Sequence, residues 1–455
     1  MCGVFGICAP GRDVARLSYF GLHALQHRGQ ESAGIATCEN GRLTGLRDLG
    51  LVAQVFDEQK LSGLRGELAI AHTRYSTTGS NAWANAQPLI HHGSARTVAL
   101  GHNGNLTNAD ALRDELAPRL ASTSDSEVIA AMIAADGRPL EEAGPAALER
   151  IEGAATVVGL ADGKLFAFRD SFGFRPLVLG RLDDDPVVAS ETCALDLVGA
   201  TFEREVRPGE LLIADPDGVQ SIQVVPRSGG GALCIFEFFY LARPDTRLEG
   251  VEVYGARVRM GRRLATESPV EADLVLPIPD SGTPAAIGFA RATGIPFSEG
   301  LIKNRYVHRT FIHPEQGMRE QGIRMKFNPL AEVAGKRLVI VDDSIVRGST
   351  TRQIVQMLFD AGAAEVHVRI SSPPVVSPCY YGIDLASEDE MIAAGNDVEG
   401  VRTAIGATSL AYISLEGLRE ATERPASSLC RACLTREYPT SVPEAAEKLR
   451  FEPVR

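Results

Sequence analysis

The alternation of apolar and polar positions is clearest between residues 337 and 362. Leu338–Val341 is an uninterrupted apolar run, too short for a helix, which predicts a strand buried on both faces of a parallel sheet. Two acidic residues and a loop rich in hydroxyl side chains follow it. From Arg352 to Gly362 apolar residues recur at helical spacing, and Gly362 supplies the stop. The pattern predicts strand, acidic pair, loop and helix in that order.

The rest of the C-terminal half repeats this alternation of strand and helix. Asp273–Pro279 predicts a second buried strand, Ser281–Gly294 a loop and a helix, and Val366–Ile370 a third strand. Strands that alternate with helices of this length favour a parallel sheet with right-handed crossovers. We therefore expect an α/β domain here.

The N-terminal half is richer in strands. Its pattern predicts a helix over Leu22–Gly34 with a glycine exit, and a further helix that opens at Ser124–Glu127. One predicted strand begins at Leu68 and is closed by the segment His72–Gly79. The other predicted strands are Ile35–Cys38, Thr97–Leu100, Thr156–Leu160, Leu165–Arg169, Leu177–Gly180 and Val187–Ser190. Pro226–Gly231, with the sequence PRSGGG, predicts the boundary between domains 1–228 and 229–455.

Composition narrows the function classes. A chain of 455 residues is long enough for two or three cores. The 46 Lys and Arg against 58 Asp and Glu give a net charge of −12 with both signs interspersed, which argues against a nucleic-acid partner. No apolar run approaches the ~18 residues of a membrane span, and no leader pattern opens the chain. We therefore expect a cytoplasmic protein without a membrane partner. In such a protein we do not expect the eight cysteines to form a disulfide framework.

The loop after Val341 has the chemistry of an anion site. Backbone N–H groups and a helix N-terminus can cradle a phosphate, and two carboxylates beside it can hold ribose hydroxyls or Mg²⁺. The alternative is a surface turn with solvated acids. The stretch RLVIVDDSIVRGSTT resembles the phosphoribosylpyrophosphate (PRPP) signature of type I phosphoribosyltransferases. This resemblance assigns Asp342 and Asp343 to ribose hydroxyls and Mg²⁺, and it assigns the 5-phosphate to Ser344, Arg347, Gly348, Ser349 and Thr350.

The start of the chain carries a candidate nucleophile. Cys2 follows Met1, and removal of Met1 would leave a thiol and a free α-amine, with a pKa near ~7.7 to 8.0, on the same residue. Further along, Arg74 could clamp a carboxylate, and Asn103 with Gly104 could donate to an oxyanion. Asp125, at a helix start, could receive an ammonium group. Each piece has a simpler interpretation as a turn, cap or surface charge.

Taken in order, these motifs resemble the class II glutamine amidotransferase domain, which is an N-terminal-nucleophile fold with two sheets between helix layers. The resemblance covers about the first half of the chain. It implies that Cys2 is the nucleophile, that Arg74 clamps the glutamine carboxylate, and that Asp125 binds the α-amine. It also implies that Asn103 and Gly104 form the oxyanion hole.

Between the second predicted strand and the PRPP motif lies Lys303–Lys326, which is rich in Lys, Arg, Gln and Gly. Its composition fits a flap that closes over a polyanion, although a solvated hairpin is the competing interpretation. In the family that the chain resembles, the segment closes on PRPP. Lys303, Arg305 and Lys326 would then face the pyrophosphate, and Ser281 would be a further Mg²⁺ contact. His308 departs from the motif, which often has Gly there.

Four of the cysteines form a candidate metal centre. Cys430 and Cys433 form a C-x-x-C pair, and Cys234 and Cys379 lie in the flanks CIFEFFYLARPD and SPCYYGID. Four thiolates could hold zinc or an iron–sulfur cluster, and the spacing does not separate the two. Cys8, Cys38 and Cys193 are predicted to be buried small hydrophobes.

The two halves together resemble the glutamine PRPP amidotransferases along nearly the whole length. This implies transfer of the glutamine amide nitrogen to C1 of PRPP, which yields 5-phosphoribosylamine, glutamate and pyrophosphate in purine synthesis. The same resemblance implies a [4Fe-4S] cluster on Cys234, Cys379, Cys430 and Cys433. It also implies purine nucleotide inhibitors and a homo-oligomer, neither of which follows from the residues themselves. A glucosamine-phosphate synthase type of amidotransferase would not need VDDSIVRGST. A PRPP-sensing transcription regulator would need a basic DNA-binding segment and no glutaminase half.

Overall fold

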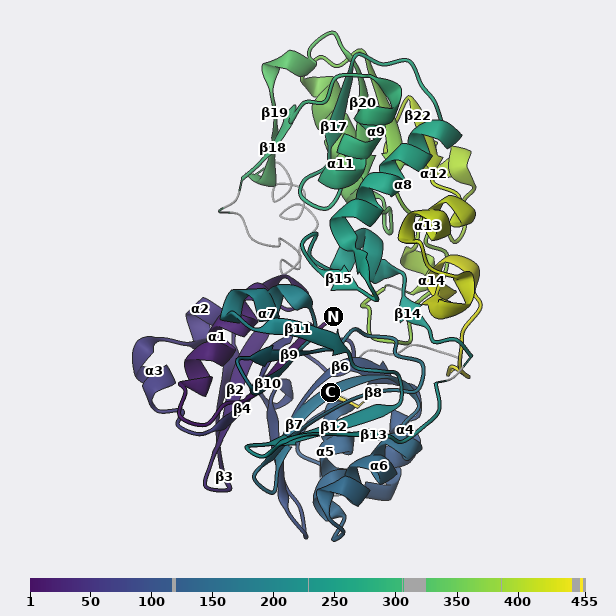
Figure 1. The fold of residues 1–455 in the computed structure, drawn as a ribbon. Coiled ribbons are helices and arrows are strands. Elements are labelled where there is room, and N and C mark those ends of the chain that lie inside the picture. The colour runs from purple at the N-terminus through teal and green to yellow at the C-terminus, as the bar shows by residue number, and fades with distance from the viewer. Residues whose placement is uncertain are drawn as a thin grey trace.

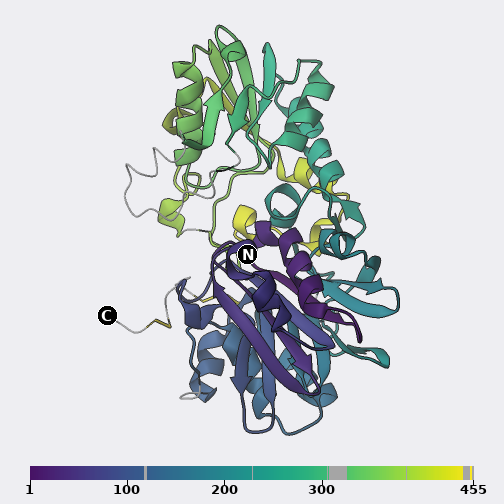
Figure 2. The same ribbon diagram turned by 90° about the vertical axis from the view of Figure 1, so that its left-hand side faces the viewer.

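The chain folds into two halves that are stacked end to end (Figure 1). The computed structural model describes residues 1–455 apart from 117–119, 228, 305, 307–324, 386, 444–450 and 453–455. The N-terminal half holds two antiparallel sheets, and the C-terminal half holds a parallel sheet. The amino terminus lies where the halves meet, and the last described residues return to the N-terminal half (Figure 2).

The first sheet is antiparallel and has β1, the strand that follows Cys2, at its centre. In spatial order its strands are β11 (Thr201–Glu205), β9 (Val178–Leu182), β10 (Asp185–Ala189), β1 (Gly3–Cys8), β4 (Leu68–Arg74), β2 (Ser32–Glu39) and β3 (Arg42–Leu49). The helices packed on its outer face are α1 (Val14–Ala24), α2 (Val52–Val55), α3 (Glu58–Ser62) and α7 (Thr192–Val198).

The second antiparallel sheet packs against the inner face of the first. In spatial order its strands are β13 (Gly218–Gln223), β12 (Glu210–Asp215), β8 (Lys164–Arg169), β7 (Gly153–Ala161), β6 (Thr97–Leu106) and β5 (Leu89–His92). Its outer face carries α4 (Ala109–Leu116), α5 (Ser126–Ala135) and α6 (Leu140–Arg150). The order helix, sheet, sheet, helix confirms the predicted sandwich.

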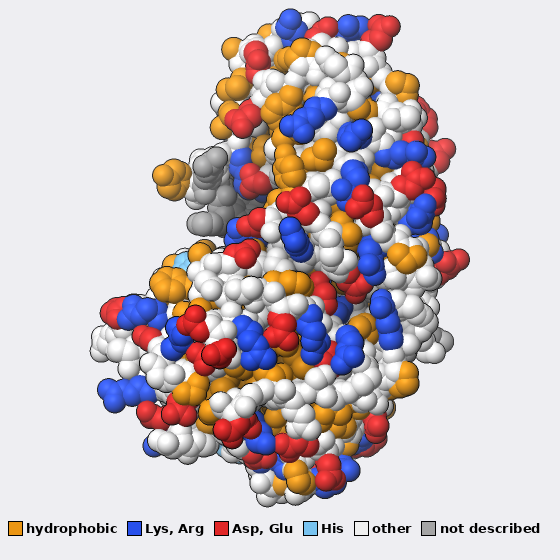
Figure 3. Space-filling view, in the orientation of Figure 1, with side chains coloured by type: hydrophobic (Ala, Val, Ile, Leu, Met, Phe, Trp, Pro, Cys, Tyr) orange, Lys and Arg blue, Asp and Glu red, His pale blue; other side chains and the backbone are white. Residues whose placement is uncertain are grey.

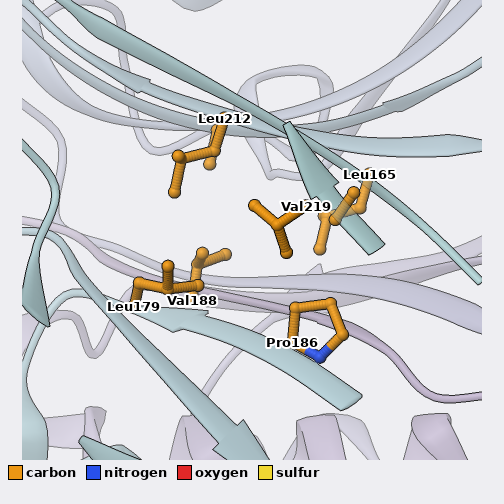
Figure 4. Close-up of a pocket in the computed structure, with 8 residues that line it drawn as sticks. Leu165, Leu179, Pro186, Val188, Leu212 and Val219 are labelled. Carbon is orange, nitrogen blue, oxygen red and sulfur yellow. The ribbon is translucent and has the colours of Figure 1, made fainter. Parts of the chain in front are cut away.

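The space between the two sheets is apolar core. Its central side chains face one another across the gap in Figure 4, and the labelled ones are Leu165, Leu179, Pro186, Val188, Leu212 and Val219. They leave a cavity of about 10 Å³, which is too small and too apolar for a ligand. Cys8 and Cys38 belong to this core, and Cys193 is buried under the first sheet, so all three are buried as predicted.

The C-terminal half is built on a parallel sheet with helices on both faces, which confirms the predicted α/β architecture. Its strands, in spatial order, are β17 (Leu274–Pro277), β20 (Arg337–Asp342), β21 (Glu365–Ile370) and β22 (Ser409–Tyr412). One face packs on α8 (Val253–Glu267), α9 (Thr283–Thr293) and α13 (Leu415–Thr422), and the other on α11 (Ser349–Asp360) and α12 (Val398–Ile405).

Small elements complete the C-terminal half. A π-helix, Glu237–Leu241, precedes α8, and α14 (Ala432–Thr435) lies near the end of the chain. The paired short strands are β14 (Leu233–Cys234) with β23 (Leu429–Cys430), β15 (Arg247–Leu248) with β16 (Val251–Glu252), and β18 (Leu301–Lys303) with β19 (Phe327–Pro329). The predicted boundary at 228/229 falls between β13 and β14, and residue 228 lies outside the described residues.

Two sequence predictions need correction. The helix predicted over Leu22–Gly34 is wrong, because α1 already ends at Ala24 and β2 begins at Ser32. The glycines are not a helix exit: a side chain at Gly34 would overlap the carbonyl oxygen of Gln87. The predicted strand Thr97–Leu100 continues to Leu106, so the GHNGNL motif lies within β6 and does not follow it.

The surface mixes both charge signs. On the face in Figure 3, Lys and Arg side chains are interspersed with Asp and Glu, in line with the acidic net charge of −12. Among the helices of the described residues, none has the length and apolar character needed to cross a bilayer.

Candidate active site

Cys2 lies at the junction of both sheets of the N-terminal half. Its backbone N–H donates to Asn103 Oδ1 on β6 at 3.2 Å, and its Sγ lies 3.5 Å from the carbonyl oxygen of Tyr75. The carbonyl oxygen of Cys2 accepts from Arg28 Nε at 3.0 Å. Met1 is buried and still joined to Cys2, so the Cys2 nitrogen is a peptide N–H here. The backbone of Cys2 is therefore fixed on both sides.

Asn103 and Gly104 lie beside Cys2 on β6. Asn103 is fully buried, and within the described part of the chain its Nδ2 has no hydrogen-bond partner. An unpaired buried donor is costly unless a ligand satisfies it, as a developing oxyanion would. A side chain at Gly104 would overlap the carbonyl oxygen of Ala154, so close packing with β7 requires glycine. The structure thus places one unpaired buried donor, Asn103 Nδ2, in the side chain that contacts Cys2.

Arg74, at the end of β4, is buried in the same region. Its guanidinium donates to the carbonyl oxygens of Ser80 at 3.0 Å and Thr78 at 3.2 Å. Burial lowers the pKa of Arg74. The groups that oppose this decrease most are Cys2, Glu31 and Asp125, so all three lie near the Arg74 guanidinium.

Asp125 occupies the N-cap position of α5, where the sequence predicted it. Its Oδ2 accepts from the backbone N–H of Leu106 at 2.9 Å, and its Oδ1 lies 3.9 Å from His102 Nδ1. The structure thus brings a buried cation, a buried carboxylate and a thiol together. That set matches the carboxylate, ammonium and amide of an α-amino acid such as glutamine.

The second predicted site lies at the carboxyl end of β20. Ser344 Oγ donates to Asp343 Oδ1 at 2.6 Å, and Ser281 Oγ donates to Asp343 Oδ2. Burial raises the pKa of Asp342 and of Asp343, and the Asp343 charge raises that of Asp342 further. Two adjacent buried carboxylates are costly while unneutralised, and a divalent cation or sugar hydroxyls would relieve that cost. Ser281 joins this group from the connection that follows β17.

The phosphate loop differs in part from its prediction. Helix α11 begins at Ser349, so Ser349 and Thr350 belong to its first turn and not to a loop. Gly348 caps it with φ of 74°, and its backbone passes close to Ile392. The first N–H groups of a helix have no intrahelical partner, so those of this turn can donate to an anion. The Arg347 guanidinium instead pairs with Glu390 at 2.6 Å on the surface.

The flap residues are only partly described. Lys303 pairs with Asp280, and the positive charge of Lys326 partly opposes the raised pKa of Asp342. Lys326 therefore lies near the acidic pair. Arg305 and His308 lie outside the described residues, as does most of the predicted flap.

The four candidate ligand cysteines lie in one region, where Cys234, Cys430 and Cys433 are buried and Cys379 is partly exposed. Cys234 and Cys430 are partners in the parallel pair of β14 and β23, and all four thiols are free. Burial raises the pKa of Cys433, and the charges of Cys234, Cys379 and Cys430 raise it further. In the part of the chain that the structure describes, no group of three or more His, Cys, Asp or Glu is placed tightly enough to hold a metal ion.

This region nevertheless has the donor set of a cluster site. The ring of Tyr381 stacks on Phe174 with centroids 4.1 Å apart and closes one side. The Arg175 guanidinium is fully buried, and burial alone would lower its pKa. The pKa is nevertheless raised, and Cys234 and Cys379 contribute most to this increase. Free, buried thiols beside a buried cation fit an anionic thiolate-bound group.

Comparison with known proteins gives the family. The family model described as glutamine amidotransferase domain matches residues 72–197, and the one described as phosphoribosyl transferase domain matches residues 260–371. The amidophosphoribosyltransferase of Mycobacterium tuberculosis (strain ATCC 25618 / H37Rv) is 54% identical over 459 residues, which span 97% of this chain and 87% of the relative. The chain belongs to the amidophosphoribosyltransferase family.

Other amidophosphoribosyltransferases agree. That of Bacillus subtilis (strain 168) is 46% identical over 451 residues, which cover 97% of this chain and 94% of the relative. A solved structure described as glutamine PRPP amidotransferase from B. subtilis complexed with ADP and GMP has a TM-score of 0.91 at 44% identity, and the match covers 97% of this chain and 98% of that one. A second solved structure, described as the allosteric regulatory enzyme of purine biosynthesis, has a TM-score of 0.93 at 44% identity. The match covers 100% of this chain and 99% of that one.

As a member of the amidophosphoribosyltransferase family, the chain is an enzyme that transfers the amide nitrogen of glutamine to C1 of PRPP. This is the first committed step of de novo purine biosynthesis. The N-terminal half carries the glutamine amidotransferase domain and the C-terminal half the phosphoribosyltransferase domain, as expected from the sequence.

Sequence reasoning missed several residues of the amidophosphoribosyltransferase sites. Arg28 and Glu31 lie within Leu22–Gly34, where the sequence predicted a helix and gave no indication of their contacts with the candidate site. Glu31 accepts from the backbone N–H of Ser76 at 2.8 Å, near Arg74. Glu452 accepts from the backbone N–H of Ser80 at 2.7 Å. No sequence signal links such distant positions.

Proposed function

We propose that Cys2 is the nucleophile of the glutaminase reaction. Once Met1 is removed, the α-amine can take the proton of the Cys2 thiol, which then attacks the glutamine amide carbon. The unpaired Asn103 Nδ2 and the backbone N–H of Gly104 would donate to the oxyanion that forms. A thioester and ammonia result, and water then releases glutamate. The unpaired donor beside Cys2 is the observation that carries this proposal.

Arg74 and Asp125 hold the amino-acid end of glutamine in this proposal. Arg74 is buried and rigidly held by the carbonyl oxygens of the loop that follows it, so its guanidinium can bind the α-carboxylate without reorganisation. Asp125 receives the α-ammonium group. This pair of opposite charges explains selection of a free amino acid over a peptide, which lacks both charges.

In the C-terminal half we propose that ammonia displaces pyrophosphate from C1 of PRPP. The first turn of α11, with Gly348, Ser349 and Thr350, binds the 5-phosphate, together with Ser344 and Arg347. Asp342 and Asp343 bind the ribose hydroxyls, and with Ser281 they contribute to holding Mg²⁺, whose charge would stabilise the pyrophosphate leaving group. Lys303, Arg305 and Lys326 are assigned to the pyrophosphate side.

The four cysteines are proposed ligands of a [4Fe-4S] cluster, supported by their convergence and by the buried Arg175 cation. Such a cluster would tie the segments that contain Cys234, Cys379, Cys430 and Cys433 together. A structural zinc ion is the second candidate, because four thiolates also satisfy zinc. Iron and zinc content of anaerobically purified protein separates the two.

We also propose that purine nucleotides inhibit the enzyme, that it forms a homo-oligomer and that it is cytoplasmic. The B. subtilis structure was described as complexed with ADP and GMP, which supports nucleotide binding. Initial rates with and without these nucleotides, and light scattering of the purified protein, test the first two points.

The direct experiment for the proposed function follows nitrogen. The protein is incubated with amide-¹⁵N-glutamine, PRPP and Mg²⁺, and pyrophosphate and labelled 5-phosphoribosylamine are quantified. We expect equal amounts of glutamate, pyrophosphate and labelled product. Glutamate formed without any labelled product would refute the coupled reaction.

A further inference from the structure

Arg28 joins the backbone of Cys2 to the C-terminal half. Its side chain is 1% exposed, and each of its guanidinium nitrogens has a partner. Nε donates to the carbonyl oxygen of Cys2 at 3.0 Å, Nη2 donates to Glu237 Oε1 at 2.8 Å, and Nη1 donates to Glu191 Oε1. Because a guanidinium is planar and rigid, the two carboxylates set the direction of the bond to Cys2.

The two carboxylates differ in what else holds them. Glu191 accepts from His27 Nε2 at 2.7 Å, from Thr246 Oγ1 at 2.7 Å and from the backbone N–H of Arg243 at 2.9 Å. It is therefore fixed whether or not Arg28 is present. Glu191 belongs to the framework on which Arg28 rests.

Glu237 has a different environment. Its side chain is fully buried, Oε1 lies 3.6 Å from Arg175 Nη1, and within the described residues Oε2 and Arg175 Nη1 have no hydrogen-bond partner. The carboxylate thus lies between two buried guanidinium groups, and its own hydrogen bond goes to Arg28. A buried carboxylate held this way is costly for stability alone, which suggests a role in orienting its partner.

Glu237 lies in a part of the chain far from Arg28 and Cys2. It begins the π-helix Glu237–Leu241, and it lies outside both ranges matched by the family models, 72–197 and 260–371. Along the chain, 209 positions separate it from Arg28. A residue that follows the strands of the glutaminase sandwich therefore reaches back to the nucleophile.

We propose that Glu237 is a positioning residue of the glutaminase site. Its negative charge holds Arg28 Nη2, so that Arg28 Nε fixes the peptide of Cys2 and keeps the thiol aligned with Asn103. This rests on the proposed role of Cys2 as nucleophile. A nucleophile displaced by ~1 Å can lose about a hundredfold in rate, so the orientation of one peptide is enough to matter. The glutaminase site is complete only when the segment around Glu237 is docked on it.

The test uses Glu237→Gln in the full-length protein. In this variant the side-chain oxygen of the introduced glutamine can still accept from Arg28. The side-chain nitrogen can take the place of Oε2, because no donor contacts Oε2 in the described residues. The variant therefore keeps the shape and volume of the side chain. Only the charge between the two guanidinium groups is lost. We expect kcat with glutamine to fall by about tenfold to a hundredfold, while KM for glutamine changes by less than about twofold, since Arg74 and Asp125 are untouched. Pyrophosphate release driven by added ammonia should stay at the wild-type rate.

Two further variants make the result specific. Glu237→Asp keeps the charge on a shorter side chain and should recover part of the lost kcat. Glu210→Gln is the matched control: Glu210 is also fully buried and pairs with Arg204 at 2.7 Å, but on β12, away from Cys2. It should leave the ratio of glutamine-driven to ammonia-driven rates unchanged. Alkylation of Cys2 by an electrophilic glutamine analogue, followed by peptide mass spectrometry, should slow in Glu237→Gln by the same factor as kcat.

The outcomes separate the possibilities. Wild-type kcat with glutamine in Glu237→Gln would overturn the inference, and so would an equal loss of glutamine-driven and ammonia-driven rates, which indicates a purely structural role. Cys2→Ala is measured in parallel. If Cys2→Ala still used glutamine, the proposed role of Cys2 would itself fail and take this inference with it. If Cys2→Ala lost glutamine use while Glu237→Gln did not, only the positioning role would fall.

Discussion

Glu127→Gln perturbs the segment that presents Asp125 to the substrate. Glu127 lies in the first turn of α5, and its side chain is 6% exposed. Its carboxylate accepts from the backbone N–H groups of Ala121 at 3.0 Å and Ser122 at 2.6 Å, and it lies 3.2 Å from His91 Nδ1. Glutamine has the same shape but one acceptor fewer, and its amide N–H groups would face other donors. The variant therefore loosens the loop beside Asp125.

The size of the effect follows from the pKa of Glu127. Burial alone would raise this pKa, but the hydrogen bonds from His91, Ala121 and Ser122 outweigh burial and lower it from 4.5 to about 2. That difference corresponds to about 3 kcal/mol of unfolding free energy. Solvent screens part of it, so we expect Glu127→Gln to lower the free energy of unfolding by about 2 kcal/mol at pH 7.

The sign of the pH dependence is fixed by the lowered pKa. A carboxylate with a depressed pKa contributes its stability above the unfolded value of 4.5 and loses it as pH falls toward about 2. The stability difference between wild type and Glu127→Gln should thus be full at pH 7 and shrink steadily below pH 4.5. Urea unfolding followed by circular dichroism at several pH values measures this. The control is Glu58→Gln, an exposed partner of Arg16, which should leave the free energy of unfolding nearly unchanged because exposed ion pairs contribute little to stability.

Activity gives a second readout of the same change. Because Asp125 is proposed to bind the ammonium group of glutamine, Glu127→Gln should raise KM for glutamine several-fold and leave the ammonia-driven reaction unchanged. The reasoning is refuted if the stability difference is as large at pH 3 as at pH 7, or if it is absent at pH 7.

Three further predictions concern the other site groups. Asp342→Asn and Asp343→Asn should slow pyrophosphate release at limiting PRPP and Mg²⁺ but spare glutamine hydrolysis; unchanged release would count against the assigned site. Cys430→Ser should yield little soluble protein, since metal binding contributes folding energy, and the wild type purified without air should contain iron; stoichiometric zinc in a folded, iron-free protein would contradict the cluster. Gly104→Ala should abolish glutamine hydrolysis because the added methyl overlaps the carbonyl oxygen of Ala154 and would displace the backbone next to Asn103; normal hydrolysis would show that the site does not depend on close packing of β6 and β7 at Gly104.

The architecture of the C-terminal half could be predicted because buried parallel strands are continuous apolar runs. Leu338–Val341 lies within β20, and Val366–Ile370 lies within β21. The fourth strand, β22 (Ser409–Tyr412), escaped prediction because it is short and begins with a polar residue at the sheet edge. Local pattern is informative only where burial on both faces imposes it.

The contacts between the halves could not be predicted from the sequence. The local spacing predicts that Arg28 belongs to one long helix, whereas it ends a separate 3-10 helix, Gln26–Arg28, that follows α1. Its partner Glu237 stands in an apolar stretch where a single acid gives no indication of its target. Pairing of such charges depends on how the two halves of the chain pack together, which a local pattern does not encode. In contrast, each motif around Cys2 is short and contiguous, so its chemistry can be inferred from the sequence.

The most direct test of the two-site account is Cys2→Ala, assayed by pyrophosphate release from PRPP with either glutamine or ammonia as nitrogen donor. The variant lacks the thioester step, while every group proposed for PRPP chemistry is intact. We predict that glutamine-driven release disappears and that ammonia-driven release persists and rises with pH, as the neutral fraction of ammonia grows. Blocking removal of Met1 should have the same effect, because the α-amine would stay in a peptide bond. Retention of glutamine use, or loss of both activities in a folded variant, would contradict the account.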